Sequence, residues 1–139
     1  MSTRCIIAKK SPAGGYDAIY CQHDGEPGYV GKLLVENYGA SSANVTRLDL
    51  LFQIGFLDEL GATIEGCVPL APAPWINPAY LYCPDLDAVY HMGAGGMACA
   101  YNYIFDGVQW MYYDALLHEF GQPYDLQPVP GQYWEGVTV

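Results

Sequence analysis

The sequence has no lysine or arginine after Arg47, although 92 residues follow that position. Residues 1–47 hold all five basic residues and four acidic ones, whereas residues 48–139 hold eleven acidic residues. Nucleic-acid phosphates and anionic lipid surfaces are bound through cationic side chains. The distribution therefore argues against both as direct ligands. It favours a partner with a basic surface, or a charge that serves solubility alone.

Long apolar runs and paired cysteine motifs are also absent. No stretch approaches the roughly 18 apolar residues of a membrane span, and no early apolar run is long enough for a signal peptide. The five cysteines are odd in number and form no C-x-x-C motif, so we expect reduced, mostly buried thiols. Charged residues make up only 14% of the chain, and we expect the thirteen tyrosines to cover part of the surface.

The chain has enough apolar residues for a single domain over residues 1–139. Hydrophobic residues make up 52% of it, which suffices for a core without disulfides or metals. Short apolar runs predict strands at 4–10 and 16–22, joined by a five-residue turn. Helical periodicity predicts helices at 29–38 and 44–54. We therefore expect an α+β fold, in which an antiparallel β-sheet has two helices packed on one face.

The later part of the chain is richer in proline. Four prolines in residues 67–78 predict a long loop that contains Trp75. Residues 121–139 predict an extended C-terminal tail that packs on the body or on a partner. The other elements expected here are short strands at 80–83 and 88–92 and a short helix at 114–120.

The strongest local signal is Asp106-Gly107 between two β-rich runs, which predicts a hairpin closed by a two-residue type I′ turn. In that register the facing pairs are Phe105 with Val108, Tyr103 with Trp110, and Tyr101 with Tyr112. All six side chains then share one face. We expect this face to belong to the core, because such a face left in water favours aggregation. A binding surface is the alternative.

The most site-like cluster consists of Cys21, His23, Asp24 and Glu26. A cysteine, a histidine and a carboxylate can form a nucleophile with its base, so a small cysteine-dependent enzyme centred on Cys21, His23 and Asp24 stays open. We favour a structural role, in which Asp24-Gly25 forms a turn and the Asp24 side chain caps the following helix.

No spacing of cysteines or histidines predicts a metal site, and we expect no cofactor. His91 is expected in a strand, and His118 near a helix end, where a partly charged imidazole is favourable. Residues 93–96 are glycine-rich but lack the lysine of a phosphate-binding loop. Asp85 and Asp87 provide too few oxygen ligands for calcium, and we expect them in a solvated turn.

Three separated segments carry a recognisable pattern. Residues 19–38 read IYCQHDGEPGYVGKLLVENY, and residues 101–114 read YNYIFDGVQWMYYD. Between them, residues 45–61 fit a second helix followed by a turn. In this order they resemble a family of small phage and prophage proteins with an I-Y-C-H-W-D-G-Y-P-like motif and a terminal aromatic hairpin. The chain departs from that pattern at 22–27 and at 92–96. The family has a polar stretch at the second of these places, and its loss argues against an enzymatic role. The resemblance implies a viral or prophage origin and the cytoplasm of the bacterial host, and it implies no reaction.

We therefore expect a phage accessory protein that binds rather than catalyses. Its acidic surface would bind a host protein with a basic surface, such as a nucleic-acid-binding defence protein, and inhibit it as an anti-CRISPR protein does. A structural or oligomeric phage module, including a homodimer, is a further alternative. The candidate partner-binding residues are Asp24, Glu26, Trp75, Asp85, Asp87, Asp114, Glu119 and Asp125.

Overall fold

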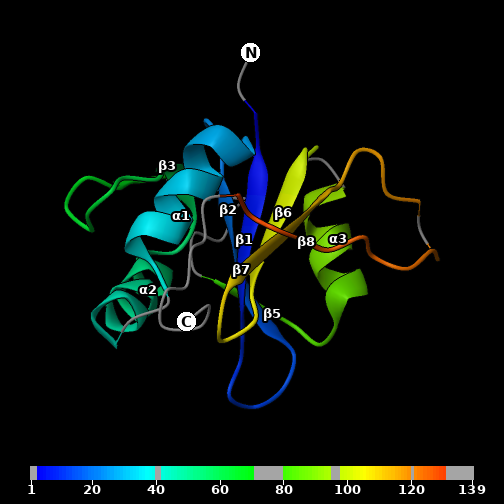
Figure 1. Cartoon of the computed structure of the whole chain (residues 1–139), viewed down its shortest axis with the longest axis horizontal. Coiled ribbons are helices and arrows are strands. Elements are labelled where there is room, and N and C mark those ends of the chain that lie inside the picture. The colour runs from blue at the N-terminus through cyan, green and yellow to red at the C-terminus, as the bar shows by residue number, and fades with distance from the viewer. Residues whose placement is uncertain (1–2, 40–41, 71–79, 95–97, 120, 131–139) are drawn as a thin grey trace.

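The computed structural model describes residues 3–39, 42–70, 80–94, 98–119 and 121–130. These residues form the expected α+β fold, with one eight-stranded sheet and three α-helices (Figure 1). The helical elements are a single turn of π-helix, η1 (Pro27–Gly31), which continues as α1 (Lys32–Asn37), then α2 (Ser42–Ile54) and α3 (Leu86–Ala94). The strands are β1 (Cys5–Lys10), β2 (Tyr16–Cys21), β3 (Leu57–Glu59), β4 (Val68–Pro69), β5 (Leu81–Cys83), β6 (Tyr101–Phe105), β7 (Trp110–Asp114) and β8 (Gln127–Pro128).

The sheet is mixed, with the strand order β4-β3-β2-β1-β6-β7-β8, and β5 pairs with β2. The expected antiparallel pairing holds for the β1–β2 and β6–β7 hairpins, whereas the central β1–β6 pair is parallel. A parallel pair requires a long crossover, and the chain between β2 and β6 is long enough to provide it. The residues of β1 by themselves do not indicate whether a strand distant in the sequence pairs with it in parallel or antiparallel.

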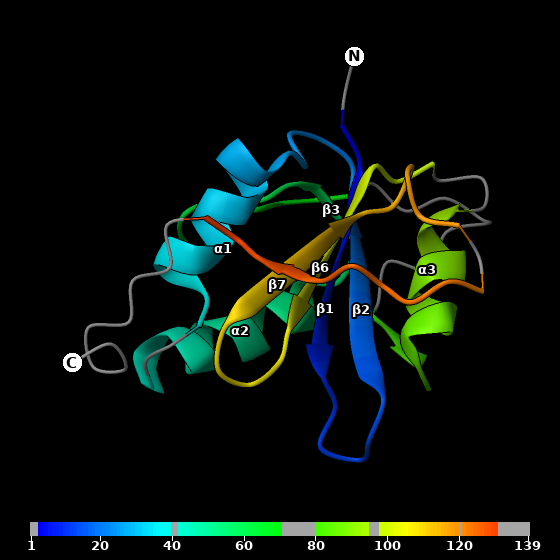
Figure 2. The same cartoon turned by 45° about the vertical axis from the view of Figure 1, so that its right-hand side comes forward.

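Helices cover both faces of the sheet (Figures 1 and 2). On the face of α1 and α2, Lys9 Nζ of β1 lies 5.3 Å from the centre of the Phe52 ring of α2. On the opposite face, Gly93 of α3 lies so close to the sheet that a Cβ there would be 2.9 Å from Ile6 Cγ1. In addition to the two expected helices on one face, the sheet therefore has a third helix on its other face.

Helix α3 replaces the strand expected at 88–92, so that prediction was wrong. Asp85 begins the helix, because its Oδ1 accepts a hydrogen bond from the backbone N–H of Ala88 at 2.9 Å. The Val89 side chain of this helix is fully buried. A short apolar run fits a buried strand or a buried helix equally well, and packing against β1 and β2 decides for the helix.

The aromatic hairpin forms with a register two residues away from the expected one. Phe105 pairs with Trp110, and Tyr103 with Tyr112. The expected type I′ turn was wrong because Asp106 Oδ1 accepts hydrogen bonds from the amides of the two residues before Trp110, each at 2.8 Å, which closes a four-residue loop. A shift of two keeps the strand side chains on their faces, whereas Val108 moves into the loop and is exposed. Tyr103 and Trp110 are fully buried, which confirms that this face belongs mainly to the core.

The helix expected at 114–120 is absent from the described residues, and a tight turn follows β7 instead. Asp114 Oδ1 accepts hydrogen bonds from the amides of Leu116 and Leu117, at 3.0 and 3.2 Å. Both leucine side chains are strongly exposed, so a helix there would have no apolar surface to pack against.

The chain after this turn returns to the sheet. In residues 121–130, β8 pairs with β7, and Val129 is buried with its N–H bonded to the Trp110 carbonyl at 3.0 Å. This part of the expected tail packs on the body. Trp75 and most of the proline-rich loop lie outside the described residues. Within the described ranges, no helix is long and apolar enough to cross a membrane.

Candidate functional site

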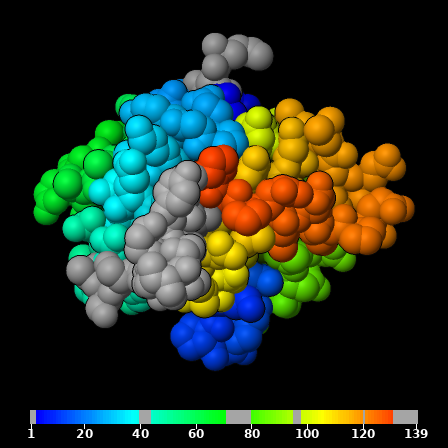
Figure 3. All heavy atoms as spheres, in the orientation of Figure 1, coloured from blue at the N-terminus to red at the C-terminus, as the bar shows by residue number. Residues whose placement is uncertain are grey.

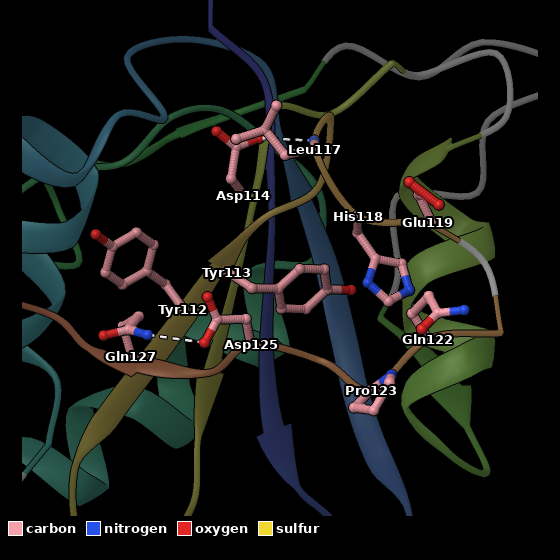
Figure 4. Close-up of a pocket in the computed structure, with 10 residues that line it drawn as sticks. All are labelled: Tyr112, Tyr113, Asp114, Leu117, His118, Glu119, Gln122, Pro123, Asp125 and Gln127. Carbon is pink, nitrogen blue, oxygen red and sulfur yellow. Dashed lines mark hydrogen bonds between the residues drawn. The ribbon is translucent and has the colours of Figure 1, made fainter.

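A surface hollow of about 450 Å³ lies beside the end of β7. Strand β8 pairs only with Met111 and Tyr112 of β7, and Tyr113 and Asp114 beyond that pairing line the hollow. The turn after β7 and the segment that returns toward β8 complete its walls (Figure 4), and that segment runs across the surface of the molecule (Figure 3). Ligand sites have volumes of roughly 300–1,000 Å³, so the hollow is large enough for a partner's side chain.

Three of the candidate carboxylates line this hollow, namely those of Asp114, Glu119 and Asp125. Asp114 holds the turn after β7, and Asp125 Oδ1 accepts a hydrogen bond from Gln127 Nε2 at 2.8 Å. None of the hollow's lining residues is a lysine or arginine. Among the described residues, none forms a salt bridge with these three carboxylates. Their negative charge is therefore uncompensated within the hollow.

Aromatic rings form the side of the hollow toward α3. The His118 imidazole stacks on the Tyr124 ring, with centres 4.2 Å apart and planes 11° apart. It also meets the rings of Tyr90 and Tyr113 edge-on, at 4.8 and 5.7 Å. Its Nε2 is buried and has no hydrogen-bond partner among the described residues. Contacts with rings from three segments hold the imidazole in place.

Hydrogen bonds tie this aromatic cluster to the rest of the fold. The Tyr113 hydroxyl accepts a hydrogen bond from Nδ2 of the buried Asn102 at 2.7 Å. The Tyr124 hydroxyl donates a hydrogen bond to Asp87 Oδ1. Burial raises the pKa of Tyr124, and this hydrogen bond raises it further. The candidate Asp87 therefore lies behind the hollow and supports it, whereas the candidate Asp85 caps α3.

The aromatic cluster was not predicted from the sequence, whereas three carboxylates of the hollow were. The cluster joins Tyr90, Tyr113, His118 and Tyr124, which lie in α3, β7 and the returning segment. No motif connects these positions along the chain. Asp114, Glu119 and Asp125 could be named because no lysine or arginine follows Arg47.

The candidates Asp24 and Glu26 lie elsewhere, in the loop between β2 and η1. Asp24 has a positive φ of 60°, and its carbonyl, rather than its side chain, accepts the N–H of Val30 at 3.1 Å. No side chain caps η1, so the expected Asp24 cap was wrong. A Cβ at Gly25 would lie 2.9 Å from that of Cys5, and the Gly25 carbonyl accepts the Tyr103 hydroxyl at 2.6 Å. These contacts give the loop a structural role.

The Cys21 thiol is fully buried and donates to the backbone carbonyl of His23 at 3.5 Å. The His23 imidazole faces another group, since its Nε2 lies 3.3 Å from Asp58 Oδ1. A nucleophilic thiol needs access to substrate and a base to accept its proton. The contacts of Cys21 therefore favour a packing role over a catalytic one.

We expect a water-soluble thiol reagent at neutral pH to label Cys67 at least about tenfold faster than the other four cysteines. Cys5, Cys21, Cys83 and Cys99 are buried, and the thiolate is the reactive form. Burial raises the pKa of the Cys5 and Cys83 thiols, and that of Cys99 to about 12. Peptide mapping by mass spectrometry measures the rates, with urea-unfolded protein as the control. Rapid labelling of Cys21 would instead support the cysteine-dependent enzyme.

Comparisons of the chain with models of protein families, with curated proteins and with solved structures found no match. Among the described residues, no group of three histidine, cysteine or acidic side chains could hold a metal ion.

Proposed function

We propose that this protein binds a partner protein through the acidic hollow and covers a basic surface of the kind that holds nucleic acid. The observation that carries the proposal is the grouping of Asp114, Glu119 and Asp125 around a hollow of ligand size without a compensating lysine or arginine. Clefts lined by one sign of charge attract ligands of the opposite sign and accelerate their association.

The charge distribution along the chain supports the same proposal. Lys9 forms ion pairs with Asp17 and Asp49, on the side of the sheet that carries α2. The hollow lies at the end of β7, among residues that belong entirely to the purely acidic part of the sequence. A cation that neutralises the hollow would therefore come from another molecule.

The resemblance to small phage proteins indicates what kind of partner to seek. A phage protein acts inside its bacterial host, and host defence proteins that bind nucleic acid carry basic grooves. A bound acidic protein would exclude the nucleic acid by occupying the groove. We therefore propose a host nucleic-acid-binding protein as the partner and inhibition as the outcome.

Affinity capture of bacterial lysate proteins at low and high salt tests the proposed function. We expect a basic protein to be retained at low salt and released at high salt, because salt screens exposed charges. The triple variant Asp114→Asn, Glu119→Gln, Asp125→Asn should retain at least about tenfold less of it. The control triple variant Glu36→Gln, Glu65→Gln, Asp106→Asn makes the same change in net charge away from the hollow and should retain it fully.

The two triple variants separate a specific site from a general charge effect. Equal loss in both would show that net charge, rather than the hollow, governs binding. Failure to retain any basic protein at either salt concentration would contradict the proposed function. Added nucleic acid should compete with the protein for the captured partner, and lack of competition would contradict the inhibitory part of the proposal.

A further inference from the structure

We infer that the hollow accepts an arginine side chain of the partner as the anchor of the complex. The inference rests on the proposed function and names the group that the hollow recognises. It follows from three features of the hollow: ring surfaces that are held in place, carboxylates on separate walls, and an exposed apolar side chain at its edge.

The ring surfaces are held before any partner binds. Tyr113 lines the hollow and is only 2% exposed, while its hydroxyl accepts a hydrogen bond from Asn102. His118 is a half-buried lining residue, and its ring is held by those of Tyr90, Tyr113 and Tyr124. The ring of Tyr112, the residue before Tyr113 in β7, points to the other side of the strand, where it stacks on Tyr103 (Figure 4). Little side-chain entropy is lost when a ligand meets rings that are already fixed, which favours binding.

The carboxylates approach the hollow from different segments. Asp114 ends β7, Glu119 follows the turn, and Asp125 belongs to the returning segment. In the view of Figure 4, the Asp125 side chain lies between Tyr112 and Tyr113. Acceptors on several sides together with flat ring surfaces suit a planar group that carries several N–H donors along its edge.

A guanidinium group matches this arrangement better than an ammonium group. It is planar, carries five N–H donors, stacks on aromatic rings and is more weakly hydrated than the ammonium of lysine. Its bonds to carboxylates are charge-assisted and can be bidentate. The arginine stem is apolar, and Leu117, 79% exposed at the edge of the hollow, provides an apolar surface for it.

Three capped tripeptides, Gly-Arg-Gly, Gly-Lys-Gly and Gly-citrulline-Gly, test the inference on the full-length protein. Citrulline keeps the planar shape of arginine but has no charge. Binding is followed by amide and ring chemical shifts of the hollow residues in a nuclear magnetic resonance titration. We expect the arginine peptide to bind at least about fivefold more tightly than the lysine peptide, and the citrulline peptide to produce no saturable shift.

Two single variants and one control locate the binding. Glu119→Gln and Asp125→Asn should each weaken binding of the arginine peptide by about three- to tenfold. Glu36→Gln, on α1, removes the same charge elsewhere and should leave binding unchanged. The folded state of each variant is checked by the dispersion of its own amide spectrum.

The outcomes distinguish the inference from the proposed function. Equal affinity for the arginine and lysine peptides, or saturable shifts outside the hollow only, would overturn the arginine anchor, as would the absence of any saturable shift. If the lysate experiment still retains a basic protein through the hollow, the proposed function stands without the anchor. If that experiment also retains nothing, both fail.

Discussion

Raising the pH from 10 to 12 is expected to unfold this protein steeply. Four tyrosines, Tyr20, Tyr38, Tyr103 and Tyr113, are at most 4% exposed. Burial raises the pKa of all four above the ordinary value of 10.0, that of Tyr20 to about 12 and those of the others further. An ionised phenol in these positions would lack the solvation that water provides.

The direction of this effect follows from proton linkage. Below pH 10, the tyrosines are neutral in the folded and unfolded states, and their full contribution to stability is present. Above pH 10, the unfolded chain loses these protons while the folded chain keeps them, so stability falls as pH rises toward the folded pKa values. Each such tyrosine removes up to about 1.4 kcal/mol per pH unit, and four together remove up to about 5.5 kcal/mol per pH unit. Domain stabilities are about 5–15 kcal/mol, so the transition falls within this window.

Circular dichroism and the ultraviolet absorbance of tyrosinate, recorded together against pH, measure this transition. Tyr103→Phe removes one titrating group and should reduce the slope above pH 10 by about 1.4 kcal/mol per pH unit. At neutral pH it should cost about 1–3 kcal/mol, because the buried Gly25 carbonyl loses its donor. Tyr80→Phe, at a position 47% exposed, is the control. Gradual ionisation of all tyrosines near pH 10 without unfolding would contradict the burial of these rings.

Replacing Trp110 is expected to cause the largest loss of stability among single substitutions in the hairpin. Its side chain is fully buried, and its Nε1 donates to the carbonyl of Tyr38 at 2.8 Å, which joins β7 to the end of α1. Trp110→Ala should lower the free energy of unfolding by about 3–5 kcal/mol through the cavity that it leaves. Trp110→Phe should cost about 1–3 kcal/mol, because the Tyr38 carbonyl loses its donor.

Urea denaturation followed by circular dichroism measures both Trp110 variants. The control is Val108→Ala in the hairpin loop, where the side chain is 62% exposed and the expected change is below about 0.5 kcal/mol. A Trp110→Phe variant as stable as the wild type would show that the indole contributes no hydrogen bond between β7 and α1. An Ala variant within about 1 kcal/mol of the wild type would contradict the burial of the ring.

Much of the local structure was predictable from the sequence. The N-terminal hairpin, the helices in residues 27–37 and 42–54, and the hairpin of β6 and β7 follow from apolar periodicity and turn residues. The errors lie where local patterns are ambiguous. The run at 88–92 suits a strand or a helix, and the side chain of Asp106 selected a longer loop than Asp106-Gly107 indicates. The aromatic face was correctly assigned because a register shift of two residues does not change which side chains share a face.

The candidate site was only partly predictable. Carboxylates could be named from the sequence, because no lysine or arginine follows Arg47 and the acids after Asp49 have no basic residue near them in the chain. Which of these acids meet could not be read from their spacing. Asp24 and Glu26 lie in the loop between β2 and η1, whereas Asp114, Glu119 and Asp125 share a hollow with the ring of His118.

The sequence by itself determined the fold class, the acidic character of the later two thirds and the apolar face of the aromatic hairpin, because each depends on composition or on spacing over a few residues. The tertiary structure alone decided the parallel β1–β6 pair, the helix on the second face and the hollow at the end of β7. These depend on contacts between segments far apart in the chain, where burial of apolar side chains and pairing of backbone groups choose among locally equivalent patterns.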